Sequence, residues 1–193
     1  MLEKINQTVA FIKGKVTIEP EVGIILGTGL GGLVKEIEKQ QALDYKDIPN
    51  FPISTVEGHT GRLIFGELGG KKVVAMQGRF HFYEGYDMKQ VTFPVRVMKF
   101  LGIQYLFVSN ASGGMNPAFE IGDLMIINDH INLMPNPLLG PNISELGPRF
   151  PDMHRAYDEK LIALAKKVAA SNGPAIRKDA TVGPTGETLK TPR

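Results

Sequence analysis

The chain has 193 residues, of which 42% are hydrophobic and 22% charged, a balance typical of a folded globular protein and unlike that of a disordered one. Its formal net charge is only +2 and its Lys and Arg residues form no block, which argues against nucleic-acid or membrane-surface partners. The absence of cysteine excludes disulfides, thiolate nucleophiles and Cys-based metal sites.

The N-terminal residues predict a helix and then a buried strand. Apolar residues recur at helical spacing over 2–12, and Gly14 follows as a stop. Residues 22–26 form a short, continuous apolar run between Pro20 and Gly27, which is typical of a strand inside a sheet. Neither a signal-peptide core nor an apolar run of roughly 18 residues occurs, so we expect a cytoplasmic protein without a membrane partner.

The middle and end of the chain predict a mixed sheet with helices. Two runs, 63–68 and 71–76, flank Gly69-Gly70 as in a hairpin, while Pro94 must lie in the first turn of the next predicted helix or kink it. The later expected elements are a helix over 88–101, strands over 105–109 and 123–128, an irregular excursion over 132–152, and a helix over 157–168. We predict one α/β domain over 1–193, with a mixed, partly barrel-like central sheet flanked by helices.

One loop, residues 78–85, carries four different hydrogen-bonding side chains. Arg79, His81, Tyr83 and Glu84 lie between two glycines, directly after a short apolar run. Ligands collect at strand ends in α/β sheets, and an arginine fork suits phosphate or carboxylate. Taken alone, the loop fits an anion site and fits equally well an exposed Arg/Glu pair whose aromatic neighbours turn into the core.

The glycine-rich segment 27–32 follows the first predicted strand. Its backbone amides, the Thr28 hydroxyl and a predicted helix over 33–38 suit a phosphate cradle. The segment also matches the dinucleotide fingerprint, although residues 40–47 carry acidic side chains without the apolar second strand that an NAD-binding unit needs. A tight turn without a ligand is the third interpretation.

Two further loops flank predicted strands. Residues 57–62 include His59. Residues 110–117 are mostly small, so we expect the Ala111 amide to be accessible to a ligand. Each is also compatible with an ordinary polar turn. Together, the four loops favour an anion, and the four histidines show no pair at metal-ligand spacing, so we expect no metal.

Five segments, in order and spacing, resemble the signatures of trimeric purine nucleoside phosphorylases. They are Gly27–Gly31, Gly58–Leu63, Gln77–Gly85, Val91–Arg96 and Asn110–Pro117, within a match that runs from about residue 21 to 129. The resemblance implies phosphorolysis of purine (deoxy)ribonucleosides such as inosine and guanosine, in purine salvage. It also implies a homotrimer and no cofactor, with inorganic phosphate as co-substrate.

The resemblance assigns roles to individual residues. It implies that phosphate is held by Thr28, His59, Arg79, Phe80, His81 and the Ala111 amide. It implies nucleoside contacts from Tyr83, Asn110, Glu187 and, in the adjacent subunit, Phe150. His81 and Glu84 are the expected catalytic pair, with Glu84 orienting the cluster.

The resemblance weakens toward the C-terminus. The family has a segment in which a Glu binds the purine and an aromatic residue precedes that Glu. The counterpart in this chain is Gly183–Thr188, which has Glu187 but lacks the aromatic residue. The chain stops at Arg193, before further family residues, so we expect it to be C-terminally incomplete, with weak or no catalysis in that form. The alternatives are a methylthioadenosine phosphorylase, a non-catalytic phosphate- or nucleoside-binding remnant and, with least support, a Rossmann-type NAD oxidoreductase.

Overall fold

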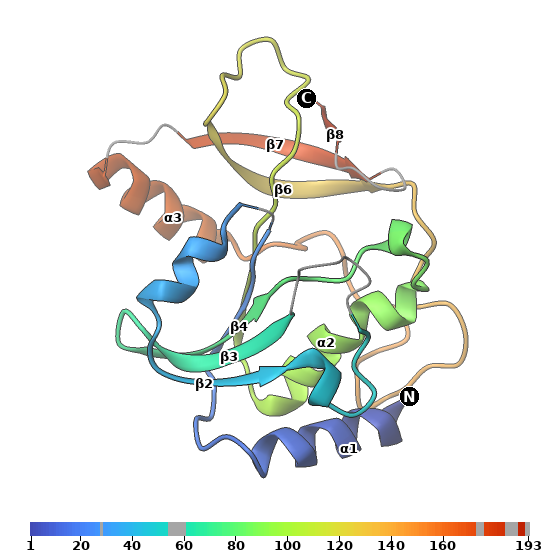
Figure 1. Ribbon diagram of the computed structural model, residues 1–193. Helices are drawn as coiled ribbons and strands as arrows, with labels where there is room; N and C mark the ends of the chain where they lie inside the picture. Colours follow the sequence, from blue (N-terminus) through green and yellow to red (C-terminus); the bar gives the residue numbers. More distant parts are fainter. Residues whose placement is uncertain (28, 54–60, 173–175, 184–188, 192–193) are drawn as a thin grey trace. The chain divides into compact units, whose positions relative to one another are not determined.

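The computed structural model describes residues 1–27, 29–53, 61–172, 176–183 and 189–191, with side chains described up to residue 172 (Figure 1). The chain divides into two compact units, Met1–Ala111 and Ser112–Arg193. We describe each unit separately, and the single domain expected from the sequence stays a prediction.

The first unit is built on a five-stranded mixed sheet of order β2-β3-β4-β1-β5. Its strands are β1 (Val22–Ile25), β2 (Glu38–Asp44), β3 (Arg62–Leu68), β4 (Lys71–Gln77) and β5 (Tyr105–Val108). β1 pairs in parallel with both β4 and β5, whereas β2, β3 and β4 are antiparallel neighbours. The predicted mixed sheet and the hairpin at Gly69-Gly70 are confirmed, but the sheet is open, with edges at β2 and β5, and does not close as a barrel.

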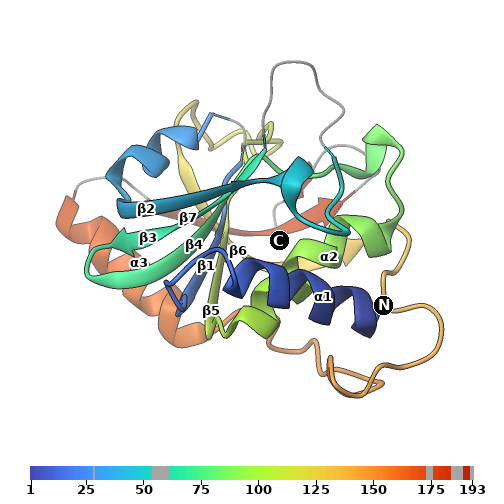
Figure 2. The same ribbon diagram turned by 60° about the horizontal axis from the view of Figure 1, so that its bottom comes forward.

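Two helices, α1 (Leu2–Lys13) and α2 (Met88–Leu101), lie side by side against this sheet (Figure 2). The strand β1 comes very close to the helical layer, because a Cβ on Gly23 would lie 2.7 Å from Ile103 Cδ1 and 3.2 Å from Met98 Sδ. Alternate side chains of β1 therefore point away from α2, and the opposite face holds Ile24, Leu26 and Val34 in a buried apolar cluster.

The segment after the glycine-rich loop differs from the prediction. A 3₁₀ helix, η1 (Gly31–Glu36), replaces the helix expected over 33–38, and β2 follows where we expected no strand. β2 lacks an apolar pattern because it is an edge strand with exposed side chains. It runs antiparallel to β3, which is not the arrangement of a dinucleotide-binding unit.

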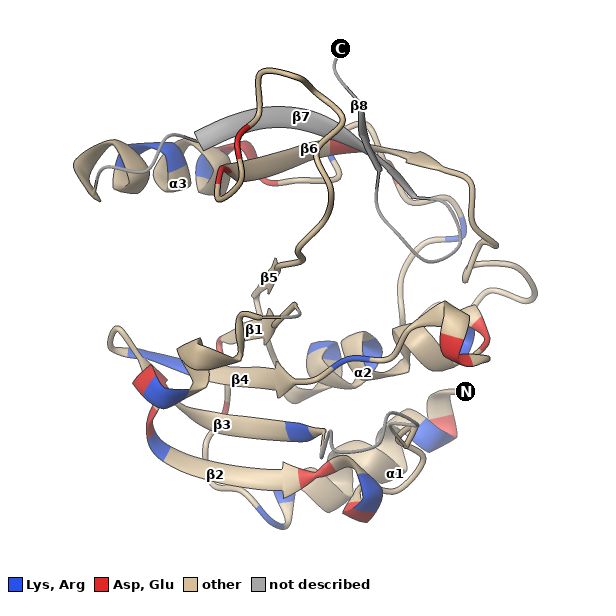
Figure 3. Cartoon of the chain, turned by 45° about the horizontal axis from the view of Figure 1, so that its top comes forward, with Lys and Arg blue, Asp and Glu red and all other residues tan. Residues whose placement is uncertain are grey.

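Exposed ion pairs accompany the strand register. Arg62 Nε lies 3.1 Å from Asp44 Oδ1 and Lys39 Nζ lies 3.0 Å from Glu67 Oε2, both between β2 and β3. Figure 3 shows basic and acidic residues interspersed along the described chain. Such exposed pairs each contribute about 0–1 kcal/mol, so we assign them a role in register and little in stability.

The helix α2 begins at a capping box and contains a proline. Asp87 Oδ1 accepts from the Gln90 amide at 2.7 Å, and Gln90 Oε1 accepts from the Asp87 amide at 2.9 Å. Pro94 is inside the helix and beyond its first turn, which leaves the Gln90 carbonyl without its usual helical donor. Gly102, with φ +109°, ends the helix as the sequence predicts.

The second unit contains a three-stranded sheet and one long helix. Its elements are β6 (Leu124–Asn132), α3 (Glu159–Asn172), β7 (Ile176–Gly183) and β8 (Leu189–Thr191), with sheet order β6-β7-β8. Residues 133–158 form neither helix nor strand, which confirms the predicted irregular excursion. Within the described ranges, no helix has the length and apolar character needed to cross a membrane.

Candidate active site

The carboxyl ends of three neighbouring parallel strands, β4, β1 and β5, lie at one edge of the first sheet. The loops that follow them start at Gly78, Leu26 and Ser109. Because β1 has parallel partners on both sides, the loops after these strands diverge there and leave backbone groups for a ligand. Three of the motifs predicted from the sequence therefore belong to one edge.

Ser109 joins these strand ends. Its hydroxyl lies 3.2 Å from the Gly27 amide, which donates to it, and 3.2 Å from the Ile25 carbonyl oxygen. Its own carbonyl accepts a hydrogen bond from Arg79 Nη1 at 3.1 Å. Our sequence reasoning did not single out Ser109, although a hydroxyl at the end of an apolar strand is a usable signal.

Gly27 is required at this junction for a steric reason. A Cβ on residue 27 would lie 2.6 Å from the Ser109 carbonyl oxygen and 2.7 Å from Asn110 Cα, both of them backbone atoms. Only glycine lets β1 and β5 end so close together. The first glycine of the motif therefore sets the spacing between two of the converging loops.

The loop after β4 turns sharply and then forms a short 3₁₀ helix, η3 (Phe82–Glu84). Gly78 has φ +90° and Gly85 has φ +93°, so both glycines occupy the left-handed region. Glu84 Oε1 accepts from the His81 amide at 3.0 Å, and the Glu84 amide donates to the His81 carbonyl at 3.1 Å. This reciprocal pair fixes the backbone at His81.

The side chains of this loop separate into exposed and buried groups. The imidazole of His81 stacks on the Tyr83 ring at 4.7 Å between centroids, and Tyr83 is exposed. Arg79 is half-buried, whereas the Phe80 ring is buried against Tyr45. Any contact of Phe80 with phosphate is thus left to its backbone.

Electrostatics distinguish the two basic groups. Burial lowers the pKa of the Arg79 guanidinium, which nevertheless keeps its charge at physiological pH. The pKa of His81 is lowered by burial and by the positive charge of Arg79. The Glu84 carboxylate acts in the opposite direction, but the net effect is a lowered pKa. The free site therefore presents one fixed positive charge and a neutral imidazole near pH 7.

We expect His81 to titrate below about 6.5, the ordinary histidine value, in the free protein. Bound phosphate should raise this pKa because an anion favours the imidazolium, and Glu84→Gln should lower it further because a carboxylate is lost. NMR titration of the imidazole measures both effects, with chloride at equal ionic strength as control. An unshifted His81 that does not respond to phosphate would contradict this electrostatic picture.

The structure brings together one group of the predicted site residues. Arg79, Phe80, His81, Tyr83 and Glu84 share the loop after β4, and Asn110 and Ala111 follow β5 directly after Ser109. Thr28, His59 and Glu187 lie outside the described residues. Phe150 belongs to the second unit, where its side chain is 87% exposed.

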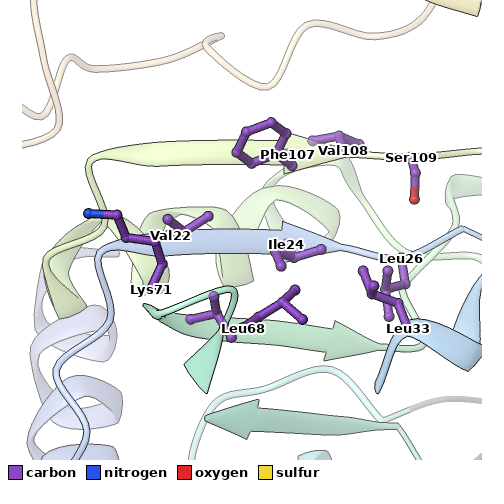
Figure 4. Close-up of a pocket in the computed structure, with 10 residues that line it drawn as sticks. Val22, Ile24, Leu26, Leu33, Leu68, Lys71, Phe107, Val108 and Ser109 are labelled. Atoms are coloured by element: carbon purple, nitrogen blue, oxygen red, sulfur yellow. The ribbon is translucent and has the colours of Figure 1, made fainter. Parts of the chain in front are cut away.

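An apolar hollow of about 440 Å³ lies on the same sheet (Figure 4). It is lined by alternate residues of β1, by Phe107 and Val108 of β5, and by Leu33 and Leu68. Lys71 and Ser109 are its only polar lining residues among those described. This lining does not suit an anion, so we place the candidate site at the strand ends and not in the hollow.

The described residues do not contain a group of side chains that could bind a metal ion. Across the described ranges, no three His, Asp or Glu side chains gather as a metal site requires. The expectation that the protein uses neither a metal nor an organic cofactor stays a prediction. The groups present at the strand ends are donors suited to an anion.

Comparison with known proteins identifies the family. Residues 21–186 match the model of the phosphorylase superfamily. The chain is 55% identical over 193 residues to purine nucleoside phosphorylase 1 of Bacillus subtilis, covering all of this chain and 71% of that protein. The chain belongs to the purine nucleoside phosphorylase family. A second family member, purine nucleoside phosphorylase 1 of Geobacillus stearothermophilus, is 57% identical over 189 residues, covering 97% of this chain and 69% of that protein.

Solved structures of the purine nucleoside phosphorylase family share the fold. A crystal structure of a purine nucleoside phosphorylase with ribose 1-phosphate has a TM-score of 0.91 at 42% identity, covering 97% of this chain and 78% of that chain. The Schistosoma mansoni enzyme with inosine has a TM-score of 0.90 at 40% identity, covering 97% and 74%. The family resemblance and the α/β fold with a mixed sheet are therefore confirmed.

Proposed function

We propose that the protein catalyses phosphorolysis of purine (deoxy)ribonucleosides. A phosphate oxygen attacks the anomeric carbon, the bond from that carbon to the purine nitrogen breaks, and the products are the free base and (deoxy)ribose 1-phosphate. The observation that carries the proposal is the joining of the β4 and β5 loops through Arg79 and Ser109. It is supported by relatives named purine nucleoside phosphorylases and by a relative's structure with ribose 1-phosphate.

The described residues suit the phosphate side of this reaction. Arg79 supplies a guanidinium already held by the Ser109 carbonyl, and His81 supplies an imidazole on a backbone braced by Glu84. A positioned phosphate stabilises the positive charge that develops on the sugar as the base leaves. We propose that Thr28, His59 and the backbone amides of Phe80 and Ala111 complete the phosphate site.

The nucleoside side of the proposal rests on Tyr83, Asn110 and Glu187. Tyr83 is exposed and stacks on His81, which leaves the other face of its ring free to pack against a sugar. Asn110 lies next to Ala111, and its Nδ2 is 3.4 Å from the Ala111 carbonyl oxygen. We assign Glu187 to the purine by family pattern alone.

The base preference is proposed as 6-oxopurine. Phosphate-dependent cleavage should be compared for inosine, guanosine, adenosine and methylthioadenosine, with the free base measured by absorbance. Preference for inosine and guanosine supports the proposal, whereas preference for methylthioadenosine selects that alternative. Nucleoside and phosphate binding without turnover would select a non-catalytic remnant, and NAD-dependent redox activity without cleavage would select the oxidoreductase.

We further propose a cytoplasmic homotrimer in which Phe150 reaches the site of the adjacent subunit. Phe150 is 87% exposed and its ring lies 5.8 Å from the Arg149 guanidinium carbon, which braces it without burying it. Large aromatic rings that are exposed in a single subunit commonly anchor a partner. The trimer itself is tested by analytical ultracentrifugation.

Phe150→Ala should raise the nucleoside KM by about tenfold through loss of one aromatic contact, at nearly constant phosphate KM. Because the ring is exposed within its own unit, the melting temperature of that unit should change little. Steady-state kinetics with each substrate varied in turn measures the effect. An unchanged nucleoside KM in an assembled trimer would remove Phe150 from the site.

A further inference from the structure

Tyr45 lies at the start of a 3₁₀ turn, η2 (Tyr45–Asp47), directly after β2. It is only 3% exposed. Its ring contacts Phe51 and Phe80, with centroid distances of 5.4 and 5.1 Å, and Phe51 contacts Phe93 of α2 at 6.0 Å. This aromatic cluster holds the Tyr45 ring in one position against Phe80, which lies between Arg79 and His81 in the chain.

Two hydrogen bonds connect Tyr45 to two different motifs of the site. The Tyr45 amide donates to the Gly61 carbonyl at 2.9 Å, at the described end of the segment 58–63. The Tyr45 hydroxyl donates to the Gly78 carbonyl at 2.7 Å, at the start of the loop after β4. One buried residue therefore bonds to both segments.

Gly61 and Gly78 lie close to each other, and Gly61 also lies close to the Tyr45 ring. A Cβ on Gly61 would lie 2.1 Å from Tyr45 Cδ2, and a Cβ on Gly78 would lie 3.5 Å from Gly61 Cα. Gly61 thus lies against the Tyr45 ring, and Gly78 lies next to Gly61. At Gly61 a side chain would overlap the Tyr45 ring, so glycine is required there.

The bond to Gly78 bears directly on Arg79. The Gly78 carbonyl belongs to the planar peptide unit that ends at the Arg79 nitrogen, so fixing that oxygen fixes the plane from which Arg79 leaves the chain. Gly78 has φ +90°, a conformation that glycine adopts without the steric cost that other residues meet. Burial raises the pKa of Tyr45, so its hydroxyl keeps its proton and can donate to the Gly78 carbonyl near neutral pH.

We propose that Tyr45 is a positioning residue of the phosphate site, which sets the distance between Gly61 and the Gly78–Arg79 peptide. This inference rests on the proposed phosphorolysis and deepens it by naming a residue that touches neither substrate. Because the phosphate site is proposed at Arg79, the effect should be large for phosphate and small for the nucleoside.

The matched experiment compares Tyr45→Phe with Thr8→Val. Thr8 is fully buried in α1, and its hydroxyl lies 2.7 Å from the Pro49 carbonyl oxygen and 2.8 Å from the Lys4 carbonyl oxygen. Each substitution removes one buried hydroxyl from the first unit, and both should lower stability. Thr8 contacts the segment near Tyr45 from the α1 side, so Thr8→Val controls for simple loosening of that segment.

Tyr45→Phe should raise the phosphate KM about tenfold and leave the inosine KM within about twofold. Thr8→Val should leave both within about twofold. The rise in melting temperature on adding phosphate gives a second readout that needs no turnover, and it should shrink in Tyr45→Phe alone. Placing 4-aminophenylalanine at position 45 restores an N–H donor toward Gly78 and should recover most of the phosphate affinity.

Equal phosphate KM values in Tyr45→Phe and Thr8→Val, at equal loss of stability, would overturn the inference and leave Tyr45 a structural residue. Failure of 4-aminophenylalanine to improve on phenylalanine would overturn it as well. A wild-type protein that neither cleaves inosine nor gains stability from phosphate would overturn the proposed function, and this inference with it. The wild-type measurements thus separate the two failures.

Discussion

Replacing Arg79 with Met is expected to lower kcat/KM for phosphate by about 10²- to 10³-fold, the usual loss for one well-aimed donor to a charge in a transition state. Arg79 carries the fixed positive charge of the described site, and the Ser109 carbonyl already holds its Nη1. Methionine keeps most of the aliphatic part of the arginine side chain and removes the guanidinium group. Steady-state kinetics with phosphate varied at saturating inosine measures the change.

Lys72→Met is the matched control for loss of charge. Lys72 is exposed near the start of β4, the strand that leads to Arg79, and it pairs in register with Glu67 at the hairpin end of that strand. This substitution should leave phosphate kinetics within about twofold and stability within about 0.5 kcal/mol. Equal losses in the two variants would mean that general electrostatic attraction, and not Arg79 itself, determines phosphate use.

Gly27→Ala is expected to destabilise the first unit by about 1–3 kcal/mol, as overpacking of a close backbone contact does. The new methyl group would meet the Ser109 carbonyl oxygen and Asn110 Cα, which are backbone atoms and cannot swing aside. Relief requires β1 and β5 to separate at their ends, which also displaces the Ser109 carbonyl from Arg79. The kcat/KM for phosphate should therefore fall. The free energy of unfolding, measured with urea, should fall in the same variant.

Gly31→Ala, in the same glycine-rich segment, serves as the stability control. A Cβ on Gly31 would meet nothing within 4 Å, and Gly31 has no positive φ. Its unfolding free energy should stay within about 0.5 kcal/mol of wild type. If Gly27→Ala were equally mild, the contact between the ends of β1 and β5 would not be the constraint that we describe.

The sequence predicts well those elements whose own pattern decides their structure. The hairpin at Gly69-Gly70 and the helix over 88–101 are local, because turn chemistry and apolar spacing specify them. The sequence does not predict β2, because an exposed edge strand needs no apolar alternation. Its strand conformation depends on pairing with β3, which is a tertiary interaction.

The candidate site shows the same division. The loop 78–85 stands out in the sequence because four different hydrogen-bonding side chains lie between two glycines. Tyr45 carries no such signal and Ser109 only that of a hydroxyl at a strand end, since their roles lie in hydrogen bonds to carbonyls and amides far away in the sequence. Backbone geometry of that kind becomes visible only when the strand ends are placed beside one another.

The central claim is that phosphate, and not water, attacks the sugar. ³¹P NMR of a mixture of the protein, inosine and inorganic phosphate tests it most directly, with hypoxanthine measured in the same sample. We predict a ribose 1-phosphate resonance that grows in equal amount with hypoxanthine and is nearly absent with Arg79→Met. Release of hypoxanthine with free ribose, at a rate independent of phosphate, would contradict the account.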